Sequence, residues 1–477
     1  MPDLHAIRKT LDSYGQSHLL AFYDELSPAQ QEALLGQIAA IDFDSLSGLI
    51  EQYVLNAPRV ELPADIQPPE IIPAKPTDPD DLARVELARK RGAELIADGK
   101  LAAFVVAGGQ GTRLGYEGPK GCLEVTPIAK KTLFHVFAEQ ILAAGRRFRS
   151  PIPWYVMTSP INDVATRAFF RQHNNFHLPA QDVFFLQQGT MPAIGLDGRI
   201  LLADKGMIAT NPNGHGGCLP ALRDSGALDD MARRGVELIS YFQVDNPLVK
   251  AIDPLFIGLH DLADADMSAK ALAKRDPMEK LGNFCLVDGK VTVIEYSDMP
   301  ERLARLAGPD GRLKFSAGSI AIHLLSRKFV QRLTETGKCR LPFHRAEKIV
   351  PHISTDGQRI KPDQPNAVKL EMFVFDAMPL AERTVILETL RSEEFSPIKN
   401  DSGPDSIATC LHDQVRRAAQ WLQAAGVAVP RDADGQVAVA LEISPLLADS
   451  AEQLADVVDP HIKLEVGQSV YLAPPPG

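Results

Sequence analysis

The chain has 477 residues, of which 45% are hydrophobic and 23% are charged, and its formal net charge is −11. This length exceeds the size at which one hydrophobic core keeps growing, so we expect one large domain with smaller ones attached. The acidic balance disfavours nonspecific nucleic-acid binding, which relies on a broad basic surface, and an anionic substrate would need a local basic pocket.

The sequence contains no membrane-spanning or export signal. No run of 18 apolar residues could cross a bilayer, and the N-terminal residues lack the basic flank and apolar stretch of a secretory signal. The five cysteines lie more than 50 residues apart without a CxxC pair, which argues against a zinc ribbon, a redox pair or a disulfide framework. We therefore expect a cytoplasmic protein that binds no membrane.

Residues 1–81 are expected to form an N-terminal helical segment followed by a connector. Apolar residues recur every three or four positions from Leu19 to Ile41, and Ser27-Pro28 is typical of a helix cap followed by a first-turn proline. From Asn56 to Asp81 frequent prolines disfavour regular structure and predict an extended connector: Pro58, Pro63, Pro68, Pro69, Pro73, Pro76 and Pro79.

Residues 82–390 are predicted to form a large α/β domain. Short apolar runs at 101–107, 152–157, 183–186 and 238–244 alternate with helical segments. Continuous apolar strands fit a mostly parallel sheet sandwiched by helices, in which ligands bind beyond the carboxyl ends of the strands. Residues 391–477 open with a helix near 414–424 and end in short apolar pieces, which predicts a small C-terminal α+β domain.

The most informative stretch is a glycine-rich loop that follows the first apolar run. Phe104 to Gly121 reads FVVAGGQGTRLGYEGPKG, with Gly108, Gly109, Gln110 and Gly111 at its start. The glycines let the backbone approach a ligand and present N–H groups to phosphate oxygens, and Arg113 and Lys120 add positive charge. The spacing matches neither the dinucleotide fingerprint GxGxxG nor the Walker A loop.

This loop resembles the nucleotide-binding loop of the eukaryotic-type UDP-N-acetylhexosamine pyrophosphorylases, within the UDP-glucose pyrophosphorylase family. Further similar motifs follow in order over residues 100–400: IPWYVMTS, FFLQQG, NGHGG, QVDN, VIEYS, KLEMFVF and FSPIKN. The resemblance implies a Rossmann-like, GT-A-like nucleotidyltransferase domain that uses Mg²⁺. It implies that UTP and a sugar 1-phosphate are converted into a UDP-sugar and pyrophosphate.

The resemblance also assigns site residues. Arg113 and Lys120, the candidates from the loop itself, would hold the triphosphate together with Lys369 and Lys399. Asp245, which ends an apolar run and should face the cleft, would bind Mg²⁺. The residues implied for nucleotide binding are Gly108, Gly109, Gln110, Gly111, Gln188, Pro212 and Gly214, and those implied for the sugar are His215, Asp245, Gly282, Glu295, Ser319, Phe373 and Phe375.

Two departures from the family pattern fall among the sugar residues. His215 stands where the acetylhexosamine enzymes usually have asparagine, and their N-A-G-N element is Ser316-Ala-Gly-Ser319 here. We predict N-acetylglucosamine 1-phosphate as the substrate. Glucose 1-phosphate, galactose 1-phosphate and a broad sugar range stay open as alternatives, as does a non-catalytic sugar-nucleotide sensor. The oligomeric state is left open between a monomer and a weak dimer.

Overall fold

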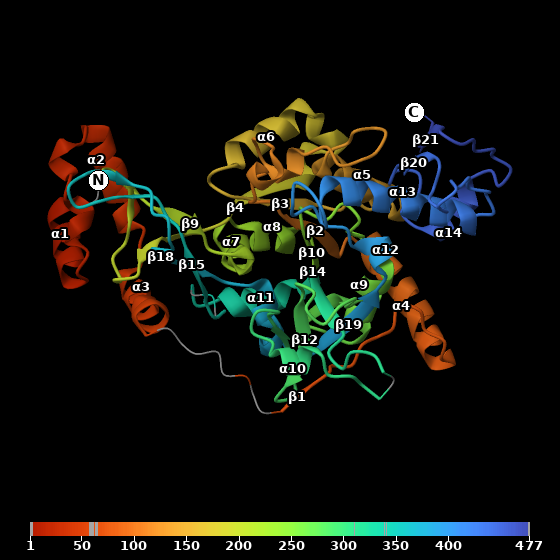
Figure 1. Cartoon of the computed structure of the whole chain (residues 1–477), viewed down its shortest axis with the longest axis horizontal. Helices are drawn as coiled ribbons and strands as arrows, with labels where there is room; N and C mark the ends of the chain where they lie inside the picture. Colours follow the sequence, from red (N-terminus) through yellow and green to blue (C-terminus); the bar gives the residue numbers. More distant parts are fainter. Residues whose placement is uncertain are drawn as a thin grey trace. The chain divides into compact units, whose positions relative to one another are not determined.

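The computed structural model describes residues 3–56, 62, 65–309, 311–337, 339 and 341–475 (Figure 1). The chain forms two compact units. Unit 1 comprises Met1–Pro63, Gln188–Cys218 and Leu341–Val374, and unit 2 comprises Ala64–Gln187, Leu219–Arg340 and Phe375–Gly477. Each unit is assembled from separate stretches of chain, whereas the division at residues 81 and 390 used contiguous segments and stays a prediction.

Unit 2 is built on a 10-stranded sheet with the order β1-β12-β14-β10-β2-β3-β4 along its main path. The predicted apolar runs form four neighbouring parallel strands, β2 (Leu101–Val106), β3 (Trp154–Thr158), β4 (Val183–Gln187) and β10 (Leu238–Gln243). The sheet continues with β1 (Ile66–Gln67), β11 (Met267–Ala273), β12 (Gly282–Val287), β13 (Lys290–Ile294), β14 (Ala317–Ser326) and β19 (Thr384–Thr389). The predicted α/β class is confirmed.

The parallel strands β2, β3 and β10 are mostly apolar because both faces of this part of the sheet are buried, whereas the edge strand β4 is largely half-buried. Phe104 and Trp154 have no exposed surface. The helices of this layer include α4 (Pro79–Ala97), α5 (Leu133–Phe148), α6 (Asp163–Gln172), α7 (Cys218–Asp224), α8 (Ala227–Arg233), α9 (Pro254–Leu262), α10 (Glu301–Ala304) and α11 (Arg327–Thr334). Continuous burial of strands between helices explains why no alternating pattern marks them in the sequence.

The strand β14 runs antiparallel to its neighbour β10. Its second half pairs with β10 from Leu238↔Ser326 to Tyr241↔His323. Its first half pairs instead with β12 through Gly282↔Ser319 and Asn283↔Gly318. A new strand therefore enters the sheet where β10 ends, and it places the start of β12 next to the carboxyl end of β10.

Unit 1 packs the N-terminal helices against two later stretches of the chain. The helices are α1 (Leu4–Ser13), α2 (Pro28–Ala39), α3 (Phe43–Leu49) and a π-helical turn at Ile50–Leu55. They share one core with β6 (Ile194–Gly195) and β18 (Ala367–Glu371), and these two strands form a three-stranded antiparallel sheet with β15 (His344–Lys348). Ser27 caps α2 in a capping box with Gln30, and Pro28 occupies the first turn, as the sequence predicts.

The other paired segments of unit 1 are short. They are β5 (Thr190–Pro192) with β9 (Thr210–Pro212), β7 (Leu202–Asp204) with β8 (Met207–Ile208), and β16 (His352–Ile353) with β17 (Arg359–Ile360). Of the prolines predicted to mark the connector, Pro58 and Pro63 lie outside the described residues.

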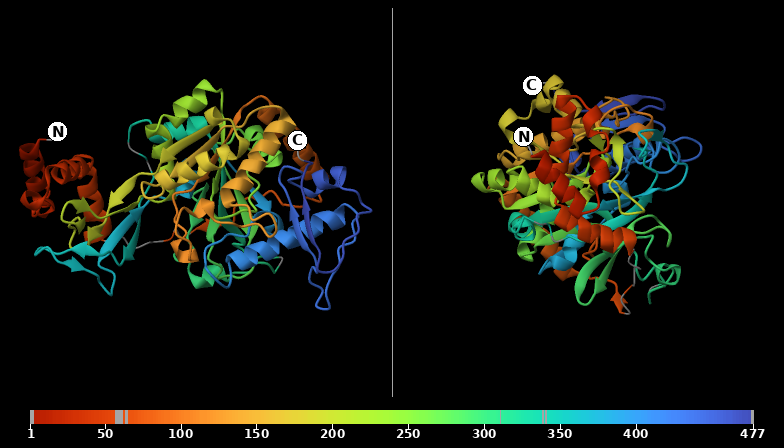
Figure 2. Two further views of the ribbon diagram at one scale, coloured as in Figure 1. Left: turned by 90° about the horizontal axis from the view of Figure 1, so that it is seen from above. Right: turned by 90° about the vertical axis from the view of Figure 1, so that its left-hand side faces the viewer.

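The C-terminal part of unit 2 forms its own small α+β cluster beside α13 (Ile407–Ala424), as Figure 2 shows in blue. The strands β20 (Ala440–Ile443) and β21 (Ser469–Leu472) and the helix α14 (Ala451–Val457) pack on Trp421 and Leu422. A short helix, α12 (Arg391–Glu394), precedes this region. Among the described residues no single helix is long and apolar enough to cross a membrane, and one helix pair reaches that length only across a 64° bend.

Candidate active site

The glycine-rich loop closes into a compact turn directly after β2. The N–H of Gly111 donates to the carbonyl oxygen of Gly118 (2.9 Å), and the N–H of Lys120 donates to that of Gly109 (3.1 Å). A methyl group at Gly111 would lie 2.7 Å from the Tyr116 ring, so only glycine fits there. Gly115 ends a 3₁₀ turn in the left-handed conformation, with φ +70°. Hydrogen bonds within the protein thus fix the backbone at Gly109 and Gly111.

Asn162 fixes the start of this loop, and the sequence did not single it out. Its fully buried amide donates through Nδ2 to the carbonyl oxygens of Ala107 (2.9 Å) and Gly109 (3.3 Å). Its Oδ1 accepts from the Ser159 N–H at 2.8 Å. One side chain therefore joins the carboxyl ends of β2 and β3. A serine three residues before an asparagine at a helix start was the available signal, since both residue types favour such caps.

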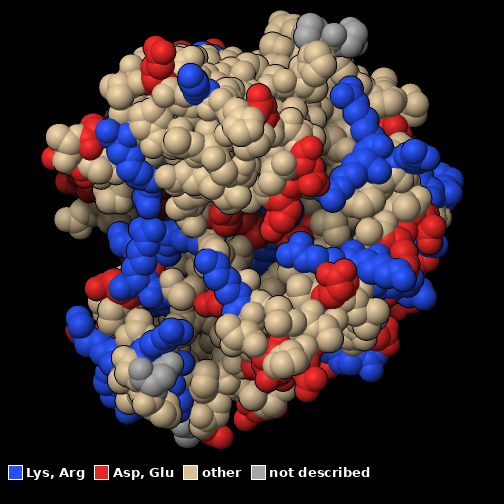
Figure 3. Space-filling model, turned by 90° about the vertical axis from the view of Figure 1, so that its right-hand side faces the viewer, with Lys and Arg blue, Asp and Glu red and all other residues tan. Residues whose placement is uncertain are grey.

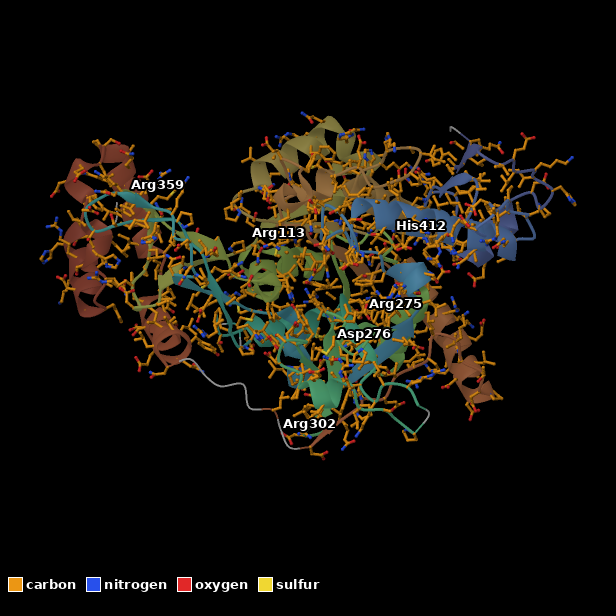
Figure 4. The ribbon with its side chains drawn as sticks, in the orientation of Figure 1. Arg113, Arg275, Asp276, Arg302, Arg359 and His412 are labelled. Carbon is orange, nitrogen blue, oxygen red and sulfur yellow. The ribbon has the colours of Figure 1, made fainter. Side chains whose placement is uncertain are left out.

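Arg113 and Lys120 extend from this loop with different degrees of freedom. Arg113 is exposed, and among the described residues its guanidinium has no hydrogen-bond or ion-pair partner; Figure 4 labels it near the end of β2. Lys120 is half-buried, and its Nζ donates to the carbonyl oxygen of Ile398 at 3.2 Å. Arg113 is therefore available to contact a ligand, whereas Lys120 is already held by a hydrogen bond to the protein.

Ile398 brings three predicted site residues together. Its backbone N–H donates to the carbonyl oxygen of Asp245 at 2.8 Å, its own carbonyl oxygen accepts from Lys120, and Lys399 is the next residue in the chain. Asn246 anchors the same segment, because its amide bonds to the backbone of Glu394 (2.7 Å) and Ser396 (3.1 Å). The loop at residues 395–400 is thus fastened to the end of β10, where Asp245 lies.

Asp245 suits a hard cation whose other ligands come from a substrate. Its half-buried carboxylate has no hydrogen-bond or ion-pair partner among the described residues. The described part of the chain holds no cluster of three or more His, Cys, Asp or Glu that could enclose a metal. A single carboxylate with substrate phosphates and water is the usual protein contribution to bound Mg²⁺. The residues present therefore fit a shared magnesium site rather than a permanent one.

Three residues predicted to contact the sugar meet where β12 enters the sheet. Gly282 pairs with Ser319 across β12 and β14, and a methyl group at Gly282 would lie 3.3 Å from Oε1 of Glu295. The pairing of β10 with β14 ends at Tyr241↔His323, so the register does not extend to Asp245. In unit 2 the structure thus gathers Gly282, Glu295 and Ser319 at the start of β12.

Gln188 and Gly214 lie together in unit 1. Gln188 is buried, and its Nε2 donates to the carbonyl oxygen of Gly214 at 2.5 Å. Gly214 has φ +85°, and a methyl group there would lie 2.3 Å from the carbonyl oxygen of Met372. Pro212 ends the strand β9 two residues earlier and is half-buried. Only glycine fits at position 214, because the backbone of Met372 passes directly against it.

His215 stacks on Phe373, with ring centroids 5.0 Å apart and an interplanar angle of 8°. His344 also stacks on Phe373, at 4.2 Å. Nδ1 of His215 accepts from the Val374 N–H at 3.2 Å. Burial, with a smaller repulsion from His344, lowers the pKa of His215 to about 4. A neutral ring whose Nδ1 accepts carries its proton on Nε2.

The two remaining residues of the prediction are already engaged or buried. Lys369 forms an ion pair with Glu371 at 2.9 Å within unit 1, so its ammonium group already has an anionic partner. Phe375 is 6% exposed and belongs to unit 2. The predicted residues therefore divide into one group in unit 2 around β2, β10 and β12 and another in unit 1 around residues 188–215 and 369–373.

The chain matches a known protein family and several named proteins over most of its length. Residues 49–413 match the family described as UTP-glucose-1-phosphate uridylyltransferase. The chain is 38% identical to the human UDP-N-acetylhexosamine pyrophosphorylase-like protein 1, over 94% of this chain and 93% of that protein. It is 35% identical to the UDP-N-acetylglucosamine pyrophosphorylase of Saccharomyces cerevisiae, over 92% of this chain and 94% of that protein.

The chain also superimposes on solved structures of proteins with similar sequences. The crystal structure of the uridine diphosphate N-acetylglucosamine pyrophosphorylase from Trypanosoma brucei superimposes with a TM-score of 0.82 at 25% identity, covering 100% of this chain and 99% of that one. A putative UDP-N-acetylglucosamine pyrophosphorylase from Entamoeba histolytica superimposes with a TM-score of 0.74 at 30% identity, covering 86% and 99%. The chain therefore belongs to the UTP-glucose-1-phosphate uridylyltransferase family.

Proposed function

We propose that this protein is a uridylyltransferase that joins UTP to N-acetylglucosamine 1-phosphate and releases pyrophosphate. The observation that carries the proposal is the hydrogen-bonded loop Gly108–Lys120, in which Arg113 has no partner among the described residues and Lys120 is linked through Ile398 to Asp245. Relatives named as a UDP-N-acetylglucosamine diphosphorylase and a UDP-N-acetylglucosamine pyrophosphorylase, which match over more than nine-tenths of the chain, support the choice of reaction and sugar.

The reaction needs positioning and charge neutralisation more than covalent chemistry. An oxygen of the sugar phosphate attacks the α-phosphorus of UTP in line, while negative charge grows on the departing pyrophosphate. We assign neutralisation of that charge to Arg113 and Lys120, and we assign to Lys399 a contact with the same phosphates because the preceding residue, Ile398, fastens its loop to both Lys120 and Asp245. Mg²⁺, when bound at Asp245, would supply further charge to the phosphate oxygens of both substrates.

Uracil recognition is assigned to Gln188, Gly109 and Gly214, with Pro212 alongside the base, as the resemblance implies. The support is that the backbone at Gly214 is held in a conformation open only to glycine, and that Gln188 is buried with its orientation fixed by Gly214. Lys369 is a weaker candidate for a phosphate contact, because Glu371 already neutralises its charge. The cytoplasmic location expected from the sequence stays a prediction.

For the identity of the sugar, a specific observation favours a second candidate substrate. His215 and Ser319 replace the amides of the acetylhexosamine pattern, which favours glucose 1-phosphate as the second candidate. Neutral His215, however, carries its proton on Nε2 and so has the donor character of an amide N–H. Glu295 can accept bonds from sugar hydroxyls of either substrate. We therefore retain the acetylated sugar as the first candidate.

The test is pyrophosphate release from UTP and Mg²⁺ with N-acetylglucosamine 1-phosphate, glucose 1-phosphate and galactose 1-phosphate measured in parallel. We expect kcat/KM to favour the acetylated sugar by more than about tenfold, which is roughly 1.4 kcal/mol. Equal or better use of the plain hexose phosphates would transfer the assignment to a UDP-glucose or broad-range enzyme. No turnover with any of the three would instead favour a non-catalytic sensor that binds sugar nucleotides.

Arg113→Ala and Asp245→Asn serve as matched variants in the same assay. Both side chains lack protein partners among the described residues, so the thermal midpoint should stay near that of the wild type. Each removes a charge that stabilises the transferred phosphoryl group, so we expect turnover to fall by about 100-fold or more. An active, well-folded variant would exclude that residue from the mechanism. Excess chelator should likewise abolish wild-type turnover if Mg²⁺ is required.

A further inference from the structure

Unit 2 contains a buried ion cluster of Lys270, Asp253 and Glu394 that has no part in the proposed reaction so far. Lys270 in β11 has no exposed surface, and its Nζ donates to Asp253 (2.7 Å) and to both carboxylate oxygens of Glu394 (2.7 and 2.5 Å). Both acids are buried as well. On the face of the molecule in Figure 3, basic and acidic side chains lie mixed at the surface, where salt and water screen them. The buried ion cluster lacks that screening.

The members of the buried ion cluster are charged. Burial alone would lower the pKa of Lys270, but attraction by Asp253 and Glu394 outweighs burial and holds that pKa above its ordinary value. Burial alone would raise the pKa of Asp253, but attraction by Lys270 outweighs it and holds the pKa of that carboxyl below its usual range. The three donors of the ammonium group thus meet three carboxylate oxygens.

Stability alone does not call for a buried ion cluster. Taking charges out of water costs free energy, and apolar side chains of similar volume in place of a buried ion pair are often neutral or stabilising. Loss of one member is destabilising, because it leaves another buried charge without its partner. The segments that carry the three residues are therefore held in one relative position, since a shift of any of them would separate the charges.

Three separate segments of unit 2 meet at the buried ion cluster. Asp253 is the N-cap of α9, and its Oδ1 accepts from the Leu255 N–H at 3.1 Å. Glu394 ends α12, and its Oε1 also accepts from the hydroxyl of Thr389, the last residue of β19, at 2.7 Å. Lys270 lies within β11, the neighbour of β19 in the sheet. The ammonium group thus fastens the start of α9 and the end of α12 to the sheet.

Of these segments, only the one that carries Glu394 runs directly into the loop at residues 395–400. The backbone carbonyl oxygen of Glu394 accepts from Asn246 Nδ2 at 2.7 Å, and Oδ1 of the same amide accepts from the Ser396 N–H at 3.1 Å. Ile398, two residues later, bonds to the end of β10 and to the glycine-rich loop. The side chain of Glu394 therefore fixes the point from which this loop departs.

We propose that Glu394, held by Lys270, is a positioning residue for the transfer reaction. It fixes the loop at residues 395–400, so that the two lysines assigned to the phosphates, Lys120 and Lys399, keep their places. The role in turnover rests on the proposed function, whereas the fixing of the loop does not. Displacement of a positioned group by about 1 Å can lower a rate about 100-fold.

The test compares Glu394→Gln with Asp253→Asn as a matched control. Each variant replaces one of the two carboxylates on the same ammonium group by an amide of the same shape, so both should lower the thermal midpoint by a similar amount. Asparagine caps helices as well as aspartate does, so α9 should keep its start. The kcat/KM for UTP should fall by about tenfold or more in Glu394→Gln and stay within about twofold of the wild type in Asp253→Asn.

Hydrogen exchange followed by mass spectrometry reports on the loop without turnover. The N–H groups of Ser396 and Ile398 are both bonded within the protein. Exchange of the peptide at residues 395–400 should be about tenfold faster in Glu394→Gln and unchanged in Asp253→Asn. Thr389→Val removes only the hydroxyl that donates to Glu394 and leaves every charge in place. It should give the same two changes to a smaller extent.

Equal turnover and equal loop exchange in Glu394→Gln and Asp253→Asn would overturn the proposal, because the buried ion cluster would then contribute to stability alone. If either amide variant does not fold, Thr389→Val decides, and wild-type exchange at residues 395–400 in that variant would overturn the proposal. Faster loop exchange with unchanged turnover would overturn the role in the reaction. A wild type without any turnover would contradict the proposed function, and the exchange measurement would still decide whether Glu394 fixes the loop.

Discussion

At the scale of single residues, the site depends on side chains that shape the backbone as much as on those that would touch a ligand. Asn162 satisfies two carbonyl oxygens of the glycine-rich loop and one N–H after β3 while fully buried. A buried polar group that loses its partner costs about 1–3 kcal/mol. The loop geometry is therefore tied to one amide that no phosphate would contact.

Substitution of Asn162 separates this positioning role from general stability. In Asn162→Asp, Oδ1 is kept but the donor to Ala107 and Gly109 is lost at neutral pH, so we expect a higher KM for UTP. Burial raises the pKa of a carboxyl group, and the protonated form regains an O–H donor. Activity relative to the wild type should therefore rise as pH falls from 8 to 6. A ratio that is flat with pH would mean that Asn162 contributes only to folding.

At the scale of elements, α4 and α9 pack closely against each other in unit 2. Each helix has a glycine at the crossing: a methyl group at Gly92 would lie 1.8 Å from the carbonyl oxygen of Pro254, and one at Gly258 would lie 1.8 Å from that of Ala88. The two helix backbones are therefore in direct contact at this crossing.

Gly92→Ala and Gly258→Ala should each destabilise the protein by about 1–3 kcal/mol or more, because the helices must move apart to make room. Gly36→Ala is the control. Gly36 also lies inside a helix, but nothing stands within 4 Å of the added methyl group, so alanine should stabilise by roughly 0.5–1 kcal/mol. Thermal midpoints of the three variants check this. A midpoint for Gly92→Ala that matches Gly36→Ala would show that α4 and α9 separate freely.

At the scale of the whole molecule, the sequence predicts those parts of the fold and of the site that depend on local patterns of residues. The four apolar runs became β2, β3, β4 and β10, and the glycine loop, Lys120, Asp245 and the segment around Ile398 meet at one end of the sheet. Those features follow from burial on both faces and from the rule that ligands meet the carboxyl ends of parallel strands.

Other features depend on contacts between distant residues, which no local period reveals. Unit 1 takes Gln188–Cys218 and Leu341–Val374 from far along the chain to complete the core of the N-terminal helices. The pairing of Lys369 with Glu371 and the stacking of His344 on Phe373 arise from that assembly. Asn162 lies in a short turn whose residue types are common in any helix cap.

Buried histidines make the stability of the whole fold depend on pH. His260 is 1% exposed, its Nδ1 lies 2.8 Å from the Ser268 hydroxyl, and burial lowers its pKa to about 4 despite opposing effects of Asp261, Asp266 and Asp264. The folded pKa is below the unfolded value of about 6.5, so below pH 6.5 the unfolded state binds a proton that the folded state does not. The free energy of unfolding therefore falls as pH drops from about 6.5 to 4, by roughly 3 kcal/mol for this group.

His260→Gln tests this contribution, because glutamine does not titrate and can still bond to Ser268. At pH 7.5 the variant should be less stable than the wild type, since its shape fits the cavity less well. On lowering the pH to 5 the wild type loses the histidine contribution and the variant does not, so the gap between their thermal midpoints should narrow by several degrees. A gap that stays constant from pH 7.5 to 5 would show that His260 already accepts a proton in the folded protein.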